Sequence, residues 1–322
     1  MESKAAARIC VPVCEASLSN LPAAMDHAAM VADFVELRLD CLDPTELDYF
    51  DPETLTQTPK PVILTLRSPD QGGHNRLTET QRLEFWTRWL KHSHDAFLDI
   101  ESELLPLIGT ASELDCSRVI VSQHDFAGVP DDLVAIYQTM AASPAAIGKI
   151  AVTANDVVDC LPIFDLLDRA RAGDKKLIAI AMGSAGVMTR ILGPSRGGFL
   201  TYAALTEDSG TAPGQTTADD LRSVYHIDTI DTDTFICGII GMPVMHSVSP
   251  HMHNAALVAH GLNGVYLPLE VRSVESFFRR MVRPQTREFD WNLKGLSVTA
   301  PHKSAVLKYL DEIDEKAMNI GA

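Results

Sequence analysis

The sequence lacks the long apolar runs and the basic excess that would point to a membrane or to nucleic acid. No run approaches the roughly 20 apolar residues of a membrane helix, and Met1-Glu2-Ser3-Lys4 opens no signal-peptide pattern. The formal net charge of −16 argues against nucleic acid or an anionic membrane as the main partner, because both need basic patches. We therefore expect a cytoplasmic protein, in which an anionic substrate requires arginines gathered locally.

Metal, redox and dinucleotide motifs are also missing. The nearest pair of cysteines, Cys10 and Cys14, has neither zinc-ligand nor redox spacing. We expect reduced and mostly buried thiols, with no disulfide and no metal site. The six cysteines are Cys10, Cys14, Cys41, Cys116, Cys160 and Cys237. No Gly-x-Gly-x-x-Gly occurs, so no dinucleotide site is predicted in this chain.

What the chain does contain is a repeated strand and helix pattern. With 322 residues, it exceeds the size at which single cores stop growing, so two domains are expected. Eight short apolar segments lie at residues 9–13, 34–39, 62–66, 96–100, 119–121, 149–152, 177–181 and 199–203. Between them, residues 20–32, 79–90, 131–141 and 156–172 have helical spacing. Eight such units in about 220 residues predict a (β/α)8 TIM barrel, with a doubly wound open sheet as the alternative.

One of these segments carries a lysine, Lys149, within the apolar run 145–152. Burying an ammonium group is costly unless it is paired, and the usual relief is a lowered pKa that leaves a nucleophilic amine. The alternative is an edge-strand lysine whose charged head reaches water.

Other ionisable residues fall where these strands end. In a barrel, the C-terminal ends of the strands converge on one mouth. Each residue could have a purely structural role when taken singly, but together they predict a site at that mouth. They are Glu36, Arg38, Arg67, Asp99, Glu101, His124 and Lys149.

The later chain adds a loop and a second domain. Residues 206–215 are polar and suit a lid over the mouth, or an ordinary connection, and residues 217–222 predict a closing helix. The acidic stretch 227–233 lacks helical periodicity, so we place the domains at 1–230 and 231–322. The second domain repeats a βαβ pattern. Strands are expected at 235–240, 264–271 and 293–299, and helices from Ser249-Pro250 and over 274–282.

Lysine, histidine and glutamate on neighbouring strands suit carbonyl chemistry. A neutral Lys149 can form an imine with a ketone, and His124 can then move protons while Glu101 orients its ring. The arginines can hold a carboxylate. This set predicts elimination of water through a Schiff base.

The motifs resemble type I 3-dehydroquinate dehydratase over residues 1 to about 226. They are Val35-Glu36-Leu37-Arg38-Leu39-Asp40, Leu66-Arg67-Ser68, Asp99-Ile100-Glu101, Ser122-Gln123-His124-Asp125-Phe126, Gly148-Lys149-Ile150-Ala151-Val152, Thr189-Arg190 and Ala212-Pro213-Gly214-Gln215. The resemblance implies a barrel that converts 3-dehydroquinate to 3-dehydroshikimate without a cofactor. It implies Lys149 as the imine lysine, His124 as the proton shuttle and Glu101 as its partner. Substrate hydroxyls are implied for Glu36, Arg38 and Arg67. The carboxylate end is implied for Arg190 and Gln215, with Thr211 where serine is expected.

The second part looks like the substrate domain of shikimate dehydrogenase. Two stretches carry this resemblance, Gly241-Met242-Pro243-Val244-Met245-His246-Ser247-Val248-Ser249-Pro250 and Ser297-Val298-Thr299-Ala300-Pro301-His302-Lys303. It implies that Ser247 and Ser249 bind the shikimate carboxylate, that Thr299 lies at this site and that Lys303 is catalytic. NADP is implied only for a part beyond Ala322, so we expect binding without turnover here.

Two other functions stay open at this point. A Schiff-base aldolase also uses a barrel lysine, although paired arginines and Gln215 suit a cyclic polyhydroxy acid better. The barrel could instead be a catalytically silent small-acid binding module for the second domain. The oligomeric state cannot be read from the sequence.

Overall fold

The computed structural model describes residues 7–51, 58–74, 76–89, 95–108, 115–212 and 214–321. Its larger sheet is parallel, with the strand order β7-β6-β5-β4-β3-β2-β1-β8. The strands are β1 (Ile9–Val13), β2 (Phe34–Arg38), β3 (Val62–Thr65), β4 (Phe97–Glu101), β5 (Val119–Asp125), β6 (Ile147–Thr153), β7 (Lys176–Met182) and β8 (Thr201–Tyr202).

The ends of this sheet meet, so it forms a barrel. Strand β8 pairs with β1 through Ile9 and Thr201. Just before β8, the Phe199 amide donates to the Leu177 carbonyl of β7 at 2.8 Å. An open doubly wound sheet would leave two separate edges, so the prediction of a (β/α)8 barrel is confirmed.

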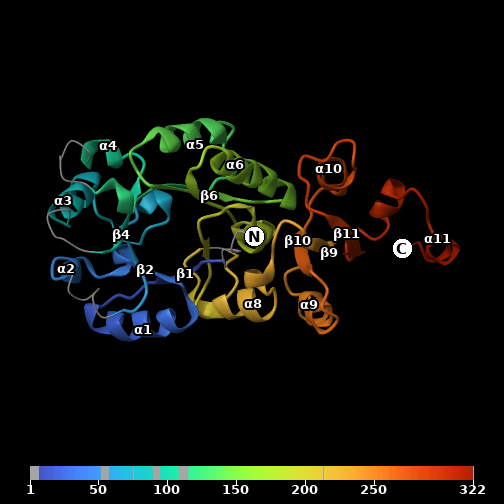
Figure 1. The fold of residues 1–322 in the computed structure, drawn as a ribbon, viewed down its shortest axis with the longest axis horizontal. Coiled ribbons are helices and arrows are strands. Elements are labelled where there is room, and N and C mark those ends of the chain that lie inside the picture. Colours follow the sequence, from blue (N-terminus) through green and yellow to red (C-terminus); the bar gives the residue numbers. More distant parts are fainter. Residues whose placement is uncertain are drawn as a thin grey trace.

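Helices cover the outside of the barrel. Figure 1 shows α1, α5 and α6 around the larger sheet, with the smaller sheet to one side. The barrel helices are α1 (Leu21–Val31), α2 (Pro44–Leu47), α3 (Glu79–Trp89), α4 (Leu105–Ile108), α5 (Leu133–Ala142), α6 (Leu161–Ala172), α7 (Val187–Leu192) and α8 (Ala218–Ser223). The expected long helices are present within a few residues, although Leu90 lies outside the described residues. None of the described helices could span a membrane.

Short 3-10 turns follow several strands and carry residues of the barrel mouth. Those used below are η2 (Leu39–Cys41), η4 (Pro69–Gln71) and η7 (Ser184–Gly186).

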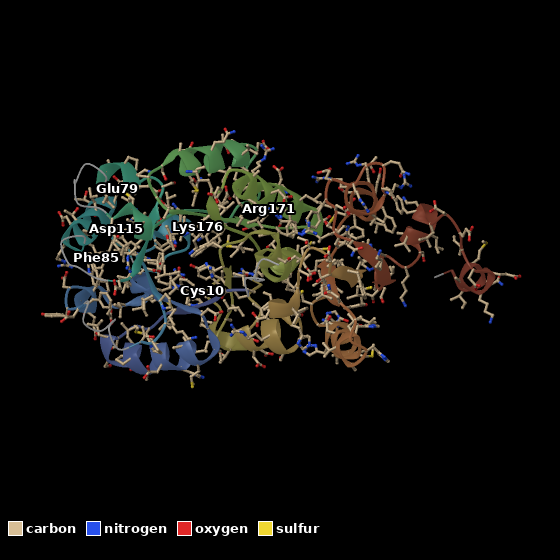
Figure 2. The ribbon with its side chains drawn as sticks, in the orientation of Figure 1. Cys10, Glu79, Phe85, Asp115, Arg171 and Lys176 are labelled. Atoms are coloured by element: carbon tan, nitrogen blue, oxygen red, sulfur yellow. A yellow bond between two sulfur atoms is a disulfide. The ribbon has the colours of Figure 1, made fainter. Side chains whose placement is uncertain are left out.

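The barrel interior changes from apolar to polar along the strands. Successive side chains of a strand alternate between the interior and the helices. The lower interior is an apolar cluster, in which Cys10 of β1 is fully buried (Figure 2). The cluster contains Cys10, Phe34, Ile63, Ile120, Ile147, Ile178, Ile180, Leu200 and Tyr202. Glu36 follows Phe34 by two positions on β2, and Lys149 follows Ile147 by two positions on β6, so each pair shares one face of its strand. The polar site therefore lies directly above the apolar cluster.

The second domain has the predicted βαβ order. Its parallel sheet contains β9 (Phe235–Gly241), β10 (Gly264–Glu270) and β11 (Leu293–Val298), with β9 in the middle. Its helices are α9 (Ser249–Ala259), α10 (Val274–Phe277), a π-helical turn η11 (Phe278–Val282) and α11 (Glu315–Ile320). Ser249 was expected to cap α9 but is its first residue, and Pro250 is the second, so the helix begins one residue earlier than expected. Helix α11 was not predicted.

The two domains pack against each other through side chains. The rings of Phe164 on α6 and Phe289 before β11 stack with centroids 4.3 Å apart. The Arg196 guanidinium lies 4.5 Å from the centroid of the Phe289 ring and donates to the Asp290 carbonyl at 2.8 Å.

Candidate active site

A cavity opens at the C-terminal ends of the barrel strands, and it gathers nearly all of the predicted site residues. Eight of the nine dehydratase residues predicted from the sequence line it: Glu36, Arg38, Arg67, His124, Lys149, Arg190, Thr211 and Gln215. Glu101 is the exception. Residues that the sequence reasoning did not assign to the site also line the cavity, among them Gln71, Phe126, Met182 and Tyr202.

Lys149 occupies the centre of this mouth and is buried, with 5% of its surface exposed. Its amine donates to Asp99 Oδ2 at 2.8 Å, to Glu36 Oε1 at 3.0 Å and to the Tyr202 hydroxyl at 2.8 Å. The amine also lies 4.2 Å from the centroid of the Tyr202 ring. Two carboxylates and a phenol therefore surround the nucleophile, so the alternative of an edge lysine reaching water is wrong. The sequence carries a signal for Tyr202, because Leu200, just before β8, and Tyr202 are two residues apart and both lie in the interior.

Asp99 links Lys149 to an arginine. Arg67 Nη2 lies 2.9 Å from Asp99 Oδ2, and Arg67 Nη1 donates to Ser122 Oγ at 2.7 Å. Burial alone would raise the pKa of Asp99, but the charges of Arg67 and Lys149 outweigh it and hold that pKa well below its usual range. Asp99 is thus a permanent anion beneath the mouth.

His124 is held as a neutral base. Burial lowers the pKa of His124 well below its ordinary value, and the nearby charges of Arg67 and Lys149 lower it further, against Asp99. Its Nδ1 atom is buried and has no hydrogen-bond partner among the described residues. The backbone amide of His124 donates to Gln71 Oε1 at 2.9 Å, which ties β5 to the η4 turn. An unprotonated imidazole facing the cavity is suited to accept a proton.

The structure does not bring Glu101 to His124. In the register of the sheet, Glu101 pairs with Ser122, two residues before His124. Its carboxylate accepts the Ser68 amide at 2.7 Å and forms an ion pair with Arg82 of α3. This placement does not support Glu101 as the partner that orients His124. Strand order alone does not reveal this placement, because it depends on Arg82, which lies on a helix outside the barrel strands.

Arg38 is held rigidly beside the cavity. Its Nε and Nη2 donate to the two carboxylate oxygens of Asp40 at 2.9 and 2.7 Å, and Nη2 also reaches the Gly72 carbonyl at 3.2 Å. Glu36 accepts a hydrogen bond from Thr65 at 2.9 Å on the neighbouring strand. A bidentate pair of this kind fixes the guanidinium plane for a ligand.

Arg190 is a buried cation without a carboxylate partner among the described residues. It is 1% exposed, its Nη1 donates to the Tyr202 carbonyl at 3.2 Å, and its Nε has no partner there. Burial lowers the pKa of Arg190 to about 10. Such a group is costly unless a ligand anion approaches it, so Arg190 marks where a carboxylate fits.

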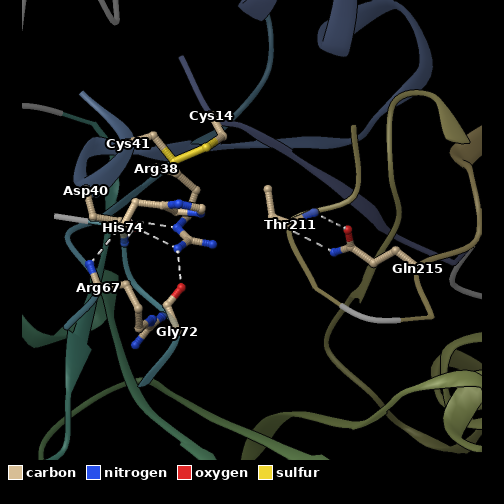
Figure 3. Close-up of a disulfide and its surroundings, with 9 residues drawn as sticks. All are labelled: Cys14, Arg38, Asp40, Cys41, Arg67, Gly72, His74, Thr211 and Gln215. Carbon is tan, nitrogen blue, oxygen red and sulfur yellow. Dashed lines mark hydrogen bonds and ion pairs between the residues drawn. A yellow bond between two sulfur atoms is a disulfide. The ribbon is translucent and has the colours of Figure 1, made fainter. Parts of the chain in front are cut away.

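The loop expected to act as a lid contributes to the same cavity. Gln215 Oε1 accepts the Thr211 amide at 2.8 Å, and both residues line the mouth (Figure 3). The neighbouring Pro213 lies outside the described residues. The helix predicted next, α8, begins after Thr217, whose side chain accepts the Asp220 amide at 3.0 Å.

The expectation that all cysteines are unpaired thiols is wrong. Cys14 and Cys41 form a disulfide, with Cα atoms 5.3 Å apart. Cys14 follows β1 and Cys41 ends η2 after β2, and these strands are neighbours with Val13 beside Leu37. Residues 27 positions apart in sequence thus meet, which cysteine spacing alone does not reveal. The free cysteines are Cys10, Cys116, Cys160 and Cys237.

In the second domain, two of the predicted stretches lie side by side after β9 and β11. The Thr299 amide donates to the Ile240 carbonyl at 2.9 Å, and the Met242 amide donates to the Ala300 carbonyl at 3.1 Å. The Ser249 amide donates to Ser247 Oγ at 3.2 Å. The side chain of Lys303 is exposed beside them.

Sequence models of known families match both domains. Residues 9–232 match the type I 3-dehydroquinase model. The chain belongs to the type I 3-dehydroquinase family. Residues 239–322 match the model of the shikimate dehydrogenase substrate binding domain. The resemblances that the motifs predicted are confirmed.

Some of the relatives combine both activities in their names, and others are named for the dehydratase alone. The chain is 34% identical to the chloroplastic bifunctional 3-dehydroquinate dehydratase/shikimate dehydrogenase of Arabidopsis thaliana, over 98% of the chain and 51% of that protein. It therefore spans about half the length of this relative. It is 32% identical to a 3-dehydroquinate dehydratase of Methanococcus vannielii, over 68% of the chain and 99% of that protein. The S. pombe AroM structure of dehydroquinate dehydratase and shikimate dehydrogenase shares the fold, with a TM-score of 0.58 at 24% identity, over 100% of this chain and 61% of that one.

Proposed function

We propose that the barrel is a Schiff-base 3-dehydroquinate dehydratase that converts 3-dehydroquinate to 3-dehydroshikimate in the shikimate pathway. The observation that carries this proposal is the buried Lys149 amine at the centre of a mouth lined by His124 and the arginines. The geometry favours this function over an aldolase and over an inert scaffold. The mouth combines a nucleophile, a neutral base and a buried guanidinium that has no carboxylate partner among the described residues.

The reaction begins at Lys149. Its amine, which donates hydrogen bonds to Glu36 and Asp99, must be unprotonated when it attacks the substrate ketone. Loss of water from the adduct gives the imine. The protonated imine withdraws electrons from the adjacent carbon, from which neutral His124 takes a proton and passes one to the leaving hydroxyl. A second water then hydrolyses the imine, so one water is lost overall and no cofactor is needed.

The remaining lining residues suit the other groups of this substrate. Arg190 is proposed to pair with the carboxylate, since no described carboxylate of the protein does so, and Gln215 and Thr211 would cover that end. Glu36, Arg38 and Arg67 are proposed to hold the ring hydroxyls. The substrate carboxylate would then accept a hydrogen bond from Arg190 Nε, which has no partner among the described residues.

The second domain is proposed to bind the related acid shikimate or 3-dehydroshikimate. Ser247, Ser249 and Thr299 would hold it, with Lys303 beside them. The family match of residues 239–322 is to the substrate binding domain, so the role proposed for these residues is binding. A cytoplasmic location also remains a prediction.

Trapping with borohydride tests the imine directly. Borohydride with 3-dehydroquinate should attach one substrate to the protein, and Lys149→Ala should abolish this attachment, as read by intact-mass spectrometry. Lys176→Ala is the matched control, because Lys176 is an exposed lysine at the other end of a barrel strand. Attachment of aldehydes alone would favour an aldolase. If no carbonyl compound becomes attached, the result would favour a catalytically silent binding module.

A further inference from the structure

Three side chains that the dehydratase chemistry does not use meet at the rim of the barrel. They are Cys14 after β1, Cys41 at the end of η2, and His74 after the η4 turn. Because β1, β2 and β3 are neighbours in the sheet, the segments that follow them lie together. One ligand atom from each residue lies within 4.8 Å of the other two. Figure 3 shows the His74 side chain beside the two sulfur atoms.

We propose that Cys14, Cys41 and His74 form a site for a thiophilic divalent cation, with Zn²⁺ as its representative, when the disulfide is reduced. Thiolates and imidazole are preferred ligands of Zn²⁺, and three protein ligands leave a fourth position for water. Cys14 and His74 are exposed and Cys41 is half-buried, so an ion can reach them from solvent. This proposal differs from the sequence-based expectation of no metal site.

The disulfide and the metal site are alternative states of the same two cysteines. A bridged sulfur offers no thiolate, so the oxidised protein cannot supply two of the three ligands. A dithiol reductant transfers two electrons and two protons to the disulfide, giving two thiols while the dithiol itself becomes a disulfide. Binding of Zn²⁺ then displaces the two thiol protons to solvent.

The rim site borders a residue that positions the active site. Asp40 directly precedes Cys41, and its carboxylate accepts the backbone amide of His74 at 3.1 Å. The same carboxylate holds Arg38 bidentately. An ion that draws Cys41 and His74 together therefore acts on the group that orients Arg38. On the proposed dehydratase function, loading the site should raise KM for 3-dehydroquinate.

The experiment measures metal binding itself, so its result does not depend on the dehydratase assignment. Reduced full-length protein should bind one equivalent of Zn²⁺ in competition with a chromophoric chelator. The oxidised protein should bind at least roughly a hundredfold more weakly, since two ligands are lost. Co²⁺ in place of Zn²⁺ should give a thiolate charge-transfer band, which reports the sulfur ligands.

Single substitutions identify the ligands. Cys41→Ser should remove about half or more of the charge-transfer intensity, because one of the two thiolates is lost. His74→Ala should shift the Co²⁺ spectrum and weaken Zn²⁺ binding by about tenfold or more. Cys237→Ser is the control, because Cys237 is a half-buried free thiol of the second domain. Equal affinity in reduced and oxidised wild-type protein would overturn the proposal without any variant. An unchanged Co²⁺ spectrum in His74→Ala would overturn the assignment of His74.

Discussion

His124 is in the protonation state that a proton acceptor requires. Burial and the charges of Arg67 and Lys149 depress its pKa, so the ring stays neutral when the pH falls through the ordinary imidazole range. An unfolded chain would take up a proton there, so this residue lowers the free energy of unfolding as the pH falls below about 6.5. Burial therefore keeps His124 neutral as a proton acceptor but makes the folded protein less stable in acid.

Replacing His124 should separate the two stages of the reaction. His124→Ala should still form the imine on Lys149, because the amine keeps its own partners, but kcat should fall by about 10²- to 10⁴-fold. Borohydride trapping and steady-state rates measure the two stages. His27→Ala, on the exposed face of α1, should change neither. Near-normal turnover in His124→Ala would mean that another group moves the proton.

Sequence periodicity predicts which residues share the mouth but not which of them pair. Alternation along each strand sends Glu36, Asp99 and Lys149 to the interior, and parallel strands bring them to one level. The partners of Glu101 are instead chosen by Arg82, a helix residue whose side chain turns back toward the barrel. The disulfide likewise depends on the register of β1 against β2, which no local pattern contains.

At the scale of elements, two loops beside the mouth, one with Gly214 and one with Gly183, pack against each other through backbone atoms. Gly214 of the lid loop has a positive φ of 68°. A Cβ atom there would lie 2.3 Å from the Gly183 carbonyl oxygen, in the loop that leads to η7 and α7. The lid that carries Gln215 and the helix that carries Arg190 are therefore fitted together at a glycine.

A methyl group at this position should push the lid away from the mouth. Gly214→Ala should raise KM for 3-dehydroquinate by about tenfold, since left-handed backbone alone costs a non-glycine residue roughly 1–2 kcal/mol. Steady-state kinetics measure the change. The matched control is Gly210→Ala in the same loop, where the nearest atom would lie 3.4 Å away and φ is negative. Equal effects in both variants would contradict a specific contact with Gly183.

At the scale of the whole molecule, one buried carboxylate joins the two domains. Glu270 ends β10 and is 8% exposed. It accepts the hydroxyl of Ser184 in η7 of the barrel, and it accepts the Val244 amide at 3.3 Å in the loop that leads to Ser247. The same side chain thus contacts the loop behind the lid and the loop of the proposed shikimate site. A second hydrogen bond also joins the domains: Asp156 of the barrel accepts the Ser273 amide of the second domain at 2.9 Å.

This bridge predicts energetic coupling between the domains. Glu270→Gln should destabilise the full chain by about 1.5–3 kcal/mol, because bonds to a buried charged acceptor are weakened. It should also raise KM for 3-dehydroquinate, since Ser184 and Gly183 support the lid. Glu275→Gln, on an exposed carboxylate of α10, is the control for charge.

A double-mutant cycle decides whether Glu270 acts through Ser184 or only through its own burial. Residues in direct contact show interaction energies of about 0.5–3 kcal/mol, whereas independent sites add. Ser184→Ala combined with Glu270→Gln should therefore cost less than the sum of the single variants, both in unfolding free energy and in KM. If the effects on KM are additive while those on the unfolding free energy are coupled, the contact between Glu270 and Ser184 only holds the domains together. Coupled effects in KM would mean that the second domain helps to set the geometry of the dehydratase lid, which would give the fusion of the two domains a physical role in the first reaction.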